Sequence, residues 1–220
     1  MSEKAIQPHE RSFDHILMSA SALDLLGGTA GVILAILGLV HYAPTDMAAV
    51  SCIALGAALA LNGGLLATER SRVMARAHAT TLEAAQFTGG VSLEAAAGLA
   101  AVVLGILTLL KIDATALMPV AALVLGVGTI FSSGVLARVN SAASAKAEDA
   151  SADRSASGEA AFPIAFHVLV GLSAIVLSIL ALIGFVPLLL SLVAFLAIGV
   201  ALILSGASVT NRMLDRSRPA

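Results

Sequence analysis

The chain has no tryptophan, one tyrosine, one cysteine and few charges. Of its 220 residues, 12% are charged and 59% are hydrophobic, and the mean hydropathy is +0.99. A soluble protein with so few charges has too little polar surface to cover itself, whereas lipid accepts apolar side chains on the outside of helices. The composition therefore predicts an integral membrane protein whose main partner is the lipid bilayer.

The lone cysteine, Cys52, lies inside an apolar run. A single thiol excludes an intrachain disulfide, a CxxC redox pair and a zinc site built from cysteines. The net charge of -2 creates no field that attracts nucleic acid, and the basic residues form no stripe with aromatic residues between them. We therefore expect no cofactor and no nucleic-acid partner.

Six apolar stretches each approach the roughly 20 residues that a helix needs to cross about 30 Å of hydrocarbon. They cover residues 23–41, 47–67, 92–110, 116–137, 163–184 and 187–209. Short connections join the first to the second, the third to the fourth and the fifth to the sixth. The expected fold is all-α, a polytopic membrane protein with six transmembrane helices arranged as three hairpins.

Basic residues predict the orientation of these spans. Eleven of the twelve Lys and Arg residues lie in four polar segments, and only Lys111 lies in a short connection. The segments are the N-terminal residues 1–22, the loop 68–91, the linker 138–162 and the tail 210–220. The tendency of basic loops to stay in the cytoplasm places all four there, with both termini.

The two long loops differ in composition. Residues 68–91 are rich in helix formers, so we expect them to extend the second helix beyond the membrane until Gly89 and Gly90 break the pattern. The linker 138–162 is rich in alanine and serine and has mixed charge. Because it has no apolar face to bury, we expect it to be disordered or a frayed helix.

Glycines at a constant separation indicate an internal repeat. Placing Leu23 over Leu93 aligns LDLLGGTAGVILAILGL with LEAAAGLAAVVLGILTL without a gap, and FHVLVGLSAIVLSILAL, which begins at Phe166, aligns with both. Abundant Gly, Ala and Leu can align by chance, but the spacing holds through both helices of each hairpin. The repeats are 23–67, 92–137 and 163–209. Three glycine pairs with one identical spacing recur in them: Gly28 and Gly56, Gly98 and Gly126, and Gly171 and Gly199.

These glycines are candidates for helix packing. No hydrophobic force drives helices together in lipid, so small residues that let backbones approach are the usual contact points, as in the GxxxG spacing of Gly27 and Gly31. Polar triplets that begin at Asn62, Ser132 and Ser205 occupy matched positions in the second helix of each repeat. They either pack against a neighbouring helix or line a path for a permeant.

A short loop carries Pro44 or Pro187, and the helix after it has a central glycine. This pattern resembles that of the HdeD-like acid-resistance membrane proteins, and the first repeat shows it in the segment GVILAILGLVHYAPTDMAAVSCIALGAALALNGGLLA. Pro119 departs from the pattern because it falls five positions later than the other two prolines, and the long second loop also departs from it. The resemblance implies a multi-pass protein of the bacterial inner membrane, linked to acid stress and without a defined enzymatic activity.

The repeat brings three ionisable residues, Asp24, Glu94 and His167, to equivalent positions at the cytoplasmic start of the odd-numbered spans. Acidic residues there complement the positive end of the helix dipole, which explains two of them without a function. The alternative is a ring that senses pH or binds a cation, with a metal held by the imidazole and two carboxylates as a further variant. His41, at the outer end of the first span, is a separate candidate for pH sensing.

Signatures of catalysis are missing from the sequence. It contains no GxSxG, HExxH or P-loop motif, and no ionisable residue falls at the centre of a span. We therefore expect no enzyme, but a structural or stress-response membrane protein that acts through helix packing, a homo-oligomer, or a membrane or cytoplasmic protein partner. The alternative is a channel or small-solute transporter with a path between the three hairpins.

Overall fold

The computed structural model describes the backbone of residues 8–77, 81–147 and 156–216, and side chains within 21–65, 93–132 and 165–207. All regular structure in these ranges is helical, which confirms the all-α prediction. The helices are α1 (Pro8–Leu39), α2 (Pro44–Ala77), α3 (Thr81–Leu109), α4 (Ala114–Ala147), α5 (Ala156–Leu182) and α6 (Pro187–Arg216).

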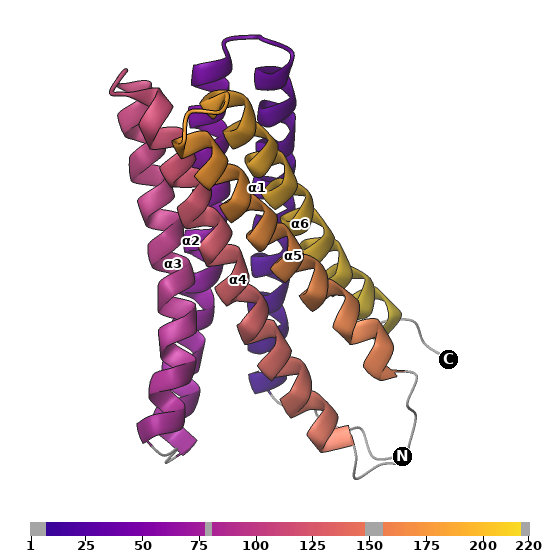
Figure 1. Ribbon diagram of the computed structural model, residues 1–220. Coiled ribbons are helices and arrows are strands. Elements are labelled where there is room, and N and C mark those ends of the chain that lie inside the picture. The colour runs from indigo at the N-terminus through magenta and orange to yellow at the C-terminus, as the bar shows by residue number, and fades with distance from the viewer. Residues whose placement is uncertain (1–7, 78–80, 148–155, 217–220) are drawn as a thin grey trace, which may run out of the picture.

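The helices form a closed ring in which each one packs against its neighbours in the chain and α1 packs against α6 (Figure 1). Helices α2, α4 and α6 also contact one another, so they form the inner set and α1, α3 and α5 the outer set. The apolar spans of α2, α4 and α6 are 44 to 50% buried, compared with 28% for α1 and 33% for α5. The outer helices therefore present most of the exposed apolar surface.

Five of the helices contain an apolar stretch long enough to cross a bilayer within the described residues. The stretches are Ser21–Leu39, Pro44–Leu65, Ala114–Ser132, Ala165–Leu182 and Pro187–Ala207. The apolar segment of α3, Leu93–Leu109, is shorter. Long apolar helices whose exposed side chains include Leu, Ile and Val suit lipid rather than water, so the molecule is a multi-pass membrane protein.

The core lies where the three inner helices meet. Its buried side chains follow one pattern, because the alignment of the three hairpins also matches the buried positions of α2, α4 and α6. Sets of matched buried residues are Cys52, Ala122 and Phe195, and Leu55, Leu125 and Ile198. Small residues are frequent at the buried positions of these helices, so the inner helices approach closely.

Each hairpin turn has the same hydrogen-bond pattern. Backbone N–H groups of Tyr42, Ile112 and Phe185 each donate to the carbonyl oxygen five positions earlier, at 3.2 Å. The preceding residue has a positive φ in every case: 65° at His41, 62° at Lys111 and 102° at Gly184. This is the Schellman arrangement that ends a helix, and it normally favours glycine at the residue with positive φ.

The long polar loops are more helical than their sequence indicates. Helix α2 continues to Ala77, which agrees with the predicted extension of the second helix, but α3 runs through Gly89 and Gly90 without a break. Glycine costs only about 1 kcal/mol in a helix interior, so packing of α3 against α2 can outweigh it. In the described part of the linker 138–162, α4 extends to Ala147 and α5 begins at Ala156, which supports the helical alternative there rather than disorder.

Candidate functional site

The three ionisable residues that the repeat aligns are all buried between helices. Asp24 is 6% exposed, Glu94 1% and His167 4%. Each lies four positions before a glycine that touches an inner helix, and residues with this spacing share one face of a helix. These side chains are therefore directed inward from α1, α3 and α5, rather than lying exposed at span ends.

Asp24 has a defined polar partner on α2. The side-chain amide of Asn62 donates to both carboxylate oxygens, with Nδ2 3.2 Å from Oδ1 and 3.1 Å from Oδ2. Asn62 begins the first of the polar triplets noted in the sequence, and Ser132 and Ser205 occupy the matching positions of α4 and α6. The triplet thus contributes a hydrogen-bond donor to the outer helix beside it.

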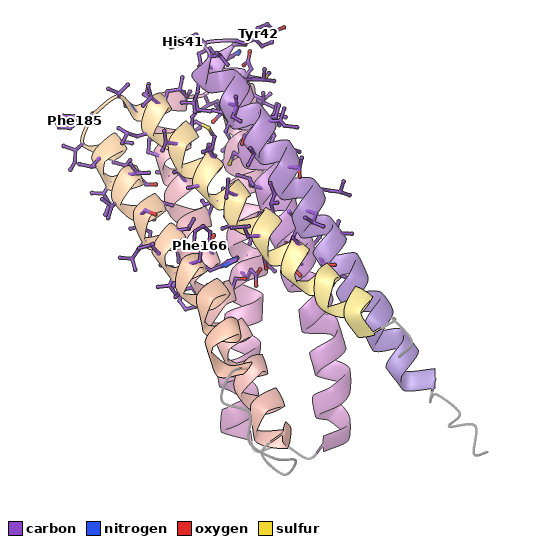
Figure 2. All side chains as sticks on the ribbon, turned by 90° about the vertical axis from the view of Figure 1, so that its right-hand side faces the viewer. His41, Tyr42, Phe166 and Phe185 are labelled. Carbon is purple, nitrogen blue, oxygen red and sulfur yellow. The ribbon has the colours of Figure 1, made fainter. Side chains whose placement is uncertain are left out.

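Two of the three candidates lie on helices that flank α2. Asp24 is on α1 and Glu94 is on α3, and both of these helices pack on α2. His167 is buried on α5, and Figure 2 labels its neighbour Phe166 near the level where the helices begin to diverge. Among the described residues, no group of three His, Cys, Asp or Glu side chains is arranged to hold a metal ion, which removes support for the metal variant.

We call Asp24, Asn62, Glu94 and His167 the buried polar cluster. His41 lies apart from these four residues. Figure 2 shows His41 and Tyr42 at the end of the bundle where the hairpin turns lie. The separation of Asp24 and His41 in the sequence corresponds to about 25 Å along a helix. His41 is exposed, so the structure does not join it to the other pH-sensing candidates.

Two polar contacts at the turn end were not anticipated from the sequence. The ammonium group of Lys111 forms an exposed ion pair with Asp46, which links the first turn to the second. The Thr115 hydroxyl donates to Oδ1 of Asp113 at 2.5 Å, and this hydrogen bond lowers the pKa of the Asp113 carboxyl. Opposite charges in two short connections were the available signal for the ion pair.

The six packing glycines meet in three pairs, and each pair joins neighbouring hairpins rather than the two helices of one hairpin. A Cβ atom built on Gly56 would lie 2.7 Å from the carbonyl oxygen of Gly98, and one built on Gly98 would lie 2.5 Å from that of Gly56. The other pairs are Gly126 with Gly171 and Gly28 with Gly199. The contacting partners therefore differ from the pairs of constant sequence spacing, although the same six positions are used.

Buried hydroxyl groups donate to backbone carbonyls. Ser51 reaches across to the carbonyl of Gly31 on α1 at 3.0 Å, and the thiol of Cys52 reaches that of Ala101 on α3 at 3.1 Å. This use of the hydroxyls suits dry helix packing. Four further hydroxyls bond to carbonyls one turn earlier in their own helices, those of Thr108, Thr129, Ser178 and Ser191.

Comparison with known proteins gives no match: no family model, curated protein or solved structure is similar to the chain. The fold and composition therefore define its class, a multi-pass membrane protein.

Proposed function

We propose that this protein is a non-catalytic, six-span membrane protein of structural or stress-response type, which acts through helix packing, assembly or partner binding. The observation that carries this proposal is the set of three glycine pairs at which helix backbones touch. Contacts this close leave no room for even a methyl group. A bundle packed in this way is a rigid scaffold.

The proposal includes three hairpin repeats, with α3 as the sixth span. Support comes from the burial pattern, which recurs when the three hairpins are aligned, and from the three turns with one hydrogen-bond pattern. The described apolar segment of α3 is Leu93–Leu109, and the helix continues toward Thr81. A helix of that length is sufficient to span a bilayer with its neighbours.

We further propose a bacterial inner-membrane location with both termini in the cytoplasm, as the HdeD-like resemblance and the distribution of basic residues suggest. Cysteines introduced at Tyr42 and Phe185, which are 68% and 67% exposed at the turn end, test this orientation in a Cys52→Ala background. An impermeant thiol reagent applied outside intact cells should label both positions. Protection of both from outside, with labelling only after lysis, would reverse the orientation.

The second candidate function is a channel or small-solute transporter. The buried polar cluster favours it, because ionisable groups inside a membrane protein often mark ion pathways. Under this alternative, a path would run between the hairpins past Asp24, Glu94 and His167. The hydroxyls bonded to backbone carbonyls weigh against a hydrated lining.

Flux through the purified protein in liposomes separates the two functions. Protons, monovalent cations and small neutral solutes are assayed at pH 7 and pH 5, with a variant carrying Asp24→Asn, Glu94→Gln and His167→Ala. A second variant carries Asp46→Asn and Asp113→Asn, which alters two exposed carboxyls at the turn end and serves as the matched control. Tight vesicles in every case support the scaffold. A leak that disappears only in the cluster variant would replace the scaffold proposal with transport.

A further inference from the structure

We propose that the turn of the third hairpin, residues 183–187, inserts into the lipid interface at the boundary between headgroups and acyl chains, whereas the other two turns lie in water. We call these residues the apolar turn. The proposal rests on the membrane-spanning arrangement proposed above. It goes beyond the scaffold function, because it assigns a lipid-anchoring surface to one hairpin of the three.

The three turns share one backbone geometry and differ in their side chains. Tyr42, Ile112 and Phe185 occupy equivalent positions, since each donates its N–H to the carbonyl oxygen five positions earlier and follows a residue with positive φ. All three side chains are exposed, at 68%, 48% and 67%. A difference in their surroundings must therefore come from the residues beside them.

The apolar turn has no acidic or basic neighbour along the chain. Residues 160–211 contain no Asp, Glu, Lys or Arg. By contrast, Asp46 follows the first turn, and Lys111 and Asp113 lie in the second. Charged side chains are costly to move out of water, so they hold the first two turns in the aqueous phase. The sequence of the third hairpin contains no such restraint.

Large hydrophobic side chains are exposed together in the apolar turn. Ile183, Phe185 and Val186 are 70%, 67% and 61% exposed. Figure 2 shows Phe185 on the outer side of the loop between α5 and α6. Water is an unfavourable surrounding for such a group, and contiguous exposed apolar residues commonly mark contact with a membrane. In a multi-pass membrane protein, the lipid beside this loop is the apolar phase within reach.

Backbone hydrogen bonding limits how deep the apolar turn can lie. The N–H groups of Ile183, Gly184 and Phe185 donate to carbonyl oxygens in the last turn of α5, at 3.0, 3.0 and 3.2 Å. Helix α6 then begins with Pro187, which has no N–H, but the next donors of a helix have no carbonyl partner within it. Unsatisfied donors are costly in hydrocarbon, whereas water and headgroup oxygens can accept from them. The interface therefore suits both the side chains and the backbone of this turn.

Tryptophan fluorescence of the full-length protein in lipid vesicles tests the proposal, because the chain has no native tryptophan. The variants Tyr42→Trp, Ile112→Trp and Phe185→Trp each place one reporter at the equivalent position of a turn. The quenchers are iodide on both sides of the membrane and, separately, lipid brominated near the carbonyl end of its acyl chains. We expect iodide to quench Phe185→Trp several-fold less than the other two variants, and brominated lipid to quench it several-fold more.

A charge introduced beside the reporter tests the cause. Val186 has a φ of 37°, which aspartate accepts more readily than a β-branched residue, so Val186→Asp should not strain the turn. In the Phe185→Trp background, this change should raise quenching by iodide to the level of Tyr42→Trp. Ala43 is the matched position of the first turn, with a φ of 42° and a proline after it. In the Tyr42→Trp background, Ala43→Asp should leave quenching unchanged.

Thiol labelling gives an independent readout. An impermeant thiol reagent reaches the interface but finds less water there, so Phe185→Cys should react several-fold more slowly than Tyr42→Cys in the Cys52→Ala background. Equal rates would contradict the proposal.

Three fluorescence results would overturn it. The first is quenching of Phe185→Trp by iodide as strong as that of Tyr42→Trp, which would place the apolar turn in water. The second is protection from both quenchers, which would show that protein covers the turn; if dilution in lipid removes the protection, the cover is a second copy of the chain. The third is unchanged quenching after Val186→Asp. Because iodide is present on both sides, none of these results depends on orientation or on flux, so their failure is distinguishable from failure of the proposed function.

Discussion

The charged residues at the two ends of the bundle differ in their exposure to solvent. At the turn end, Asp46, Lys111 and Asp113 lie in or beside short connections, where solvent reaches them. At the other end, Asp24 and Glu94 are buried between helices, and an amide on α2 donates to Asp24. Similar residue types thus make exposed contacts at one end and buried contacts between helices at the other. We expect substitutions at the buried end to cost more.

The largest effect is expected from Gly98→Leu, one turn from Glu94. A Cβ atom there would lie 2.4 Å from the backbone nitrogen of Ala60, so α2 and α3 must separate. We expect a loss of roughly 3 kcal/mol in unfolding free energy, the upper end of the usual cost of overpacking. Denaturant unfolding of the detergent-solubilised protein, followed by helicity, measures it.

Gly64→Leu is the matched control for Gly98→Leu, because a Cβ atom on Gly64 meets nothing within 4 Å. It should leave the unfolding free energy nearly unchanged. Leucine is a better helix former than glycine, so helix propensity alone cannot lower the stability of either variant. Equal losses in the two variants would therefore show that the close contact of Gly98 with α2 is not the cause.

Asn62→Ala is expected to have the next largest effect. It removes the donor from both oxygens of a carboxylate that is 6% exposed. Leaving a buried acceptor without its hydrogen bond costs about 1 to 3 kcal/mol. The exposed neighbour Leu61, replaced by Ala, is the control for loss of side-chain volume. If Asn62→Ala lowers the unfolding free energy no more than Leu61→Ala does, then substitutions at the buried end do not cost more than those at the turn end.

A reciprocal pair of substitutions tests the turn end. Gly184→Ala introduces a side chain at a φ of +102°, where no atom obstructs it, so only backbone strain of about 1 kcal/mol should appear. His41→Gly relieves the same strain at a φ of 65° and should raise the unfolding free energy by roughly 0.5 kcal/mol. Changes of the same sign in both variants would contradict a shared turn geometry.

The exposed ion pair should contribute less. Lys111 and Asp46 have side chains that are 67% and 42% exposed, and such surface pairs typically contribute about 0.2 to 1 kcal/mol. Asp46→Asn should therefore lower stability slightly at low salt and not at all at high salt. A loss of stability that persists in high salt would show that this ion pair contributes to stability in the same way as the buried contacts at the other end.

The smallest effect concerns acid. Because the Thr115 hydroxyl lowers the pKa of Asp113, the contact stabilises the folded state above the ordinary carboxyl range and is lost as pH falls through the folded-state pKa. Thr115→Ala should move the pKa of Asp113 up toward its usual range. Carbon-13 NMR of the labelled carboxyl group measures this shift, and an unchanged pKa would assign the effect to the backbone amides nearby.

Much of this architecture could be predicted because it depends on patterns within single helices. The apolar stretches indicated the helices and the positions of the turns, and the six glycines that the repeat aligns are ones that touch a neighbouring helix. Partners far apart in sequence could not be predicted in this way. Asn62 and Asp24 are 38 positions apart, and nothing local to either residue indicates which neighbour it faces.

The errors have physical causes of the same kind. Gly89 and Gly90 are weak helix formers, yet α3 continues through them because packing between helices outweighs propensity. Turn geometry at His41 and Lys111 was also hidden, because neither residue favours a positive φ. The contact partners of the six glycines were not predicted, and the glycines that touch lie on different hairpins.

Closure of the ring between α1 and α6 has a consequence for synthesis. Gly28 on the first helix meets Gly199 on the last, so the contact joins the two ends of the bundle's sequence. During translation, the surface of α1 around Gly28 must therefore remain in contact with lipid or with another protein until α6 has been made. Truncation before α6 would leave this surface of α1 permanently uncovered. An insertion chaperone that binds this surface would therefore bind intermediates of membrane insertion rather than the finished protein.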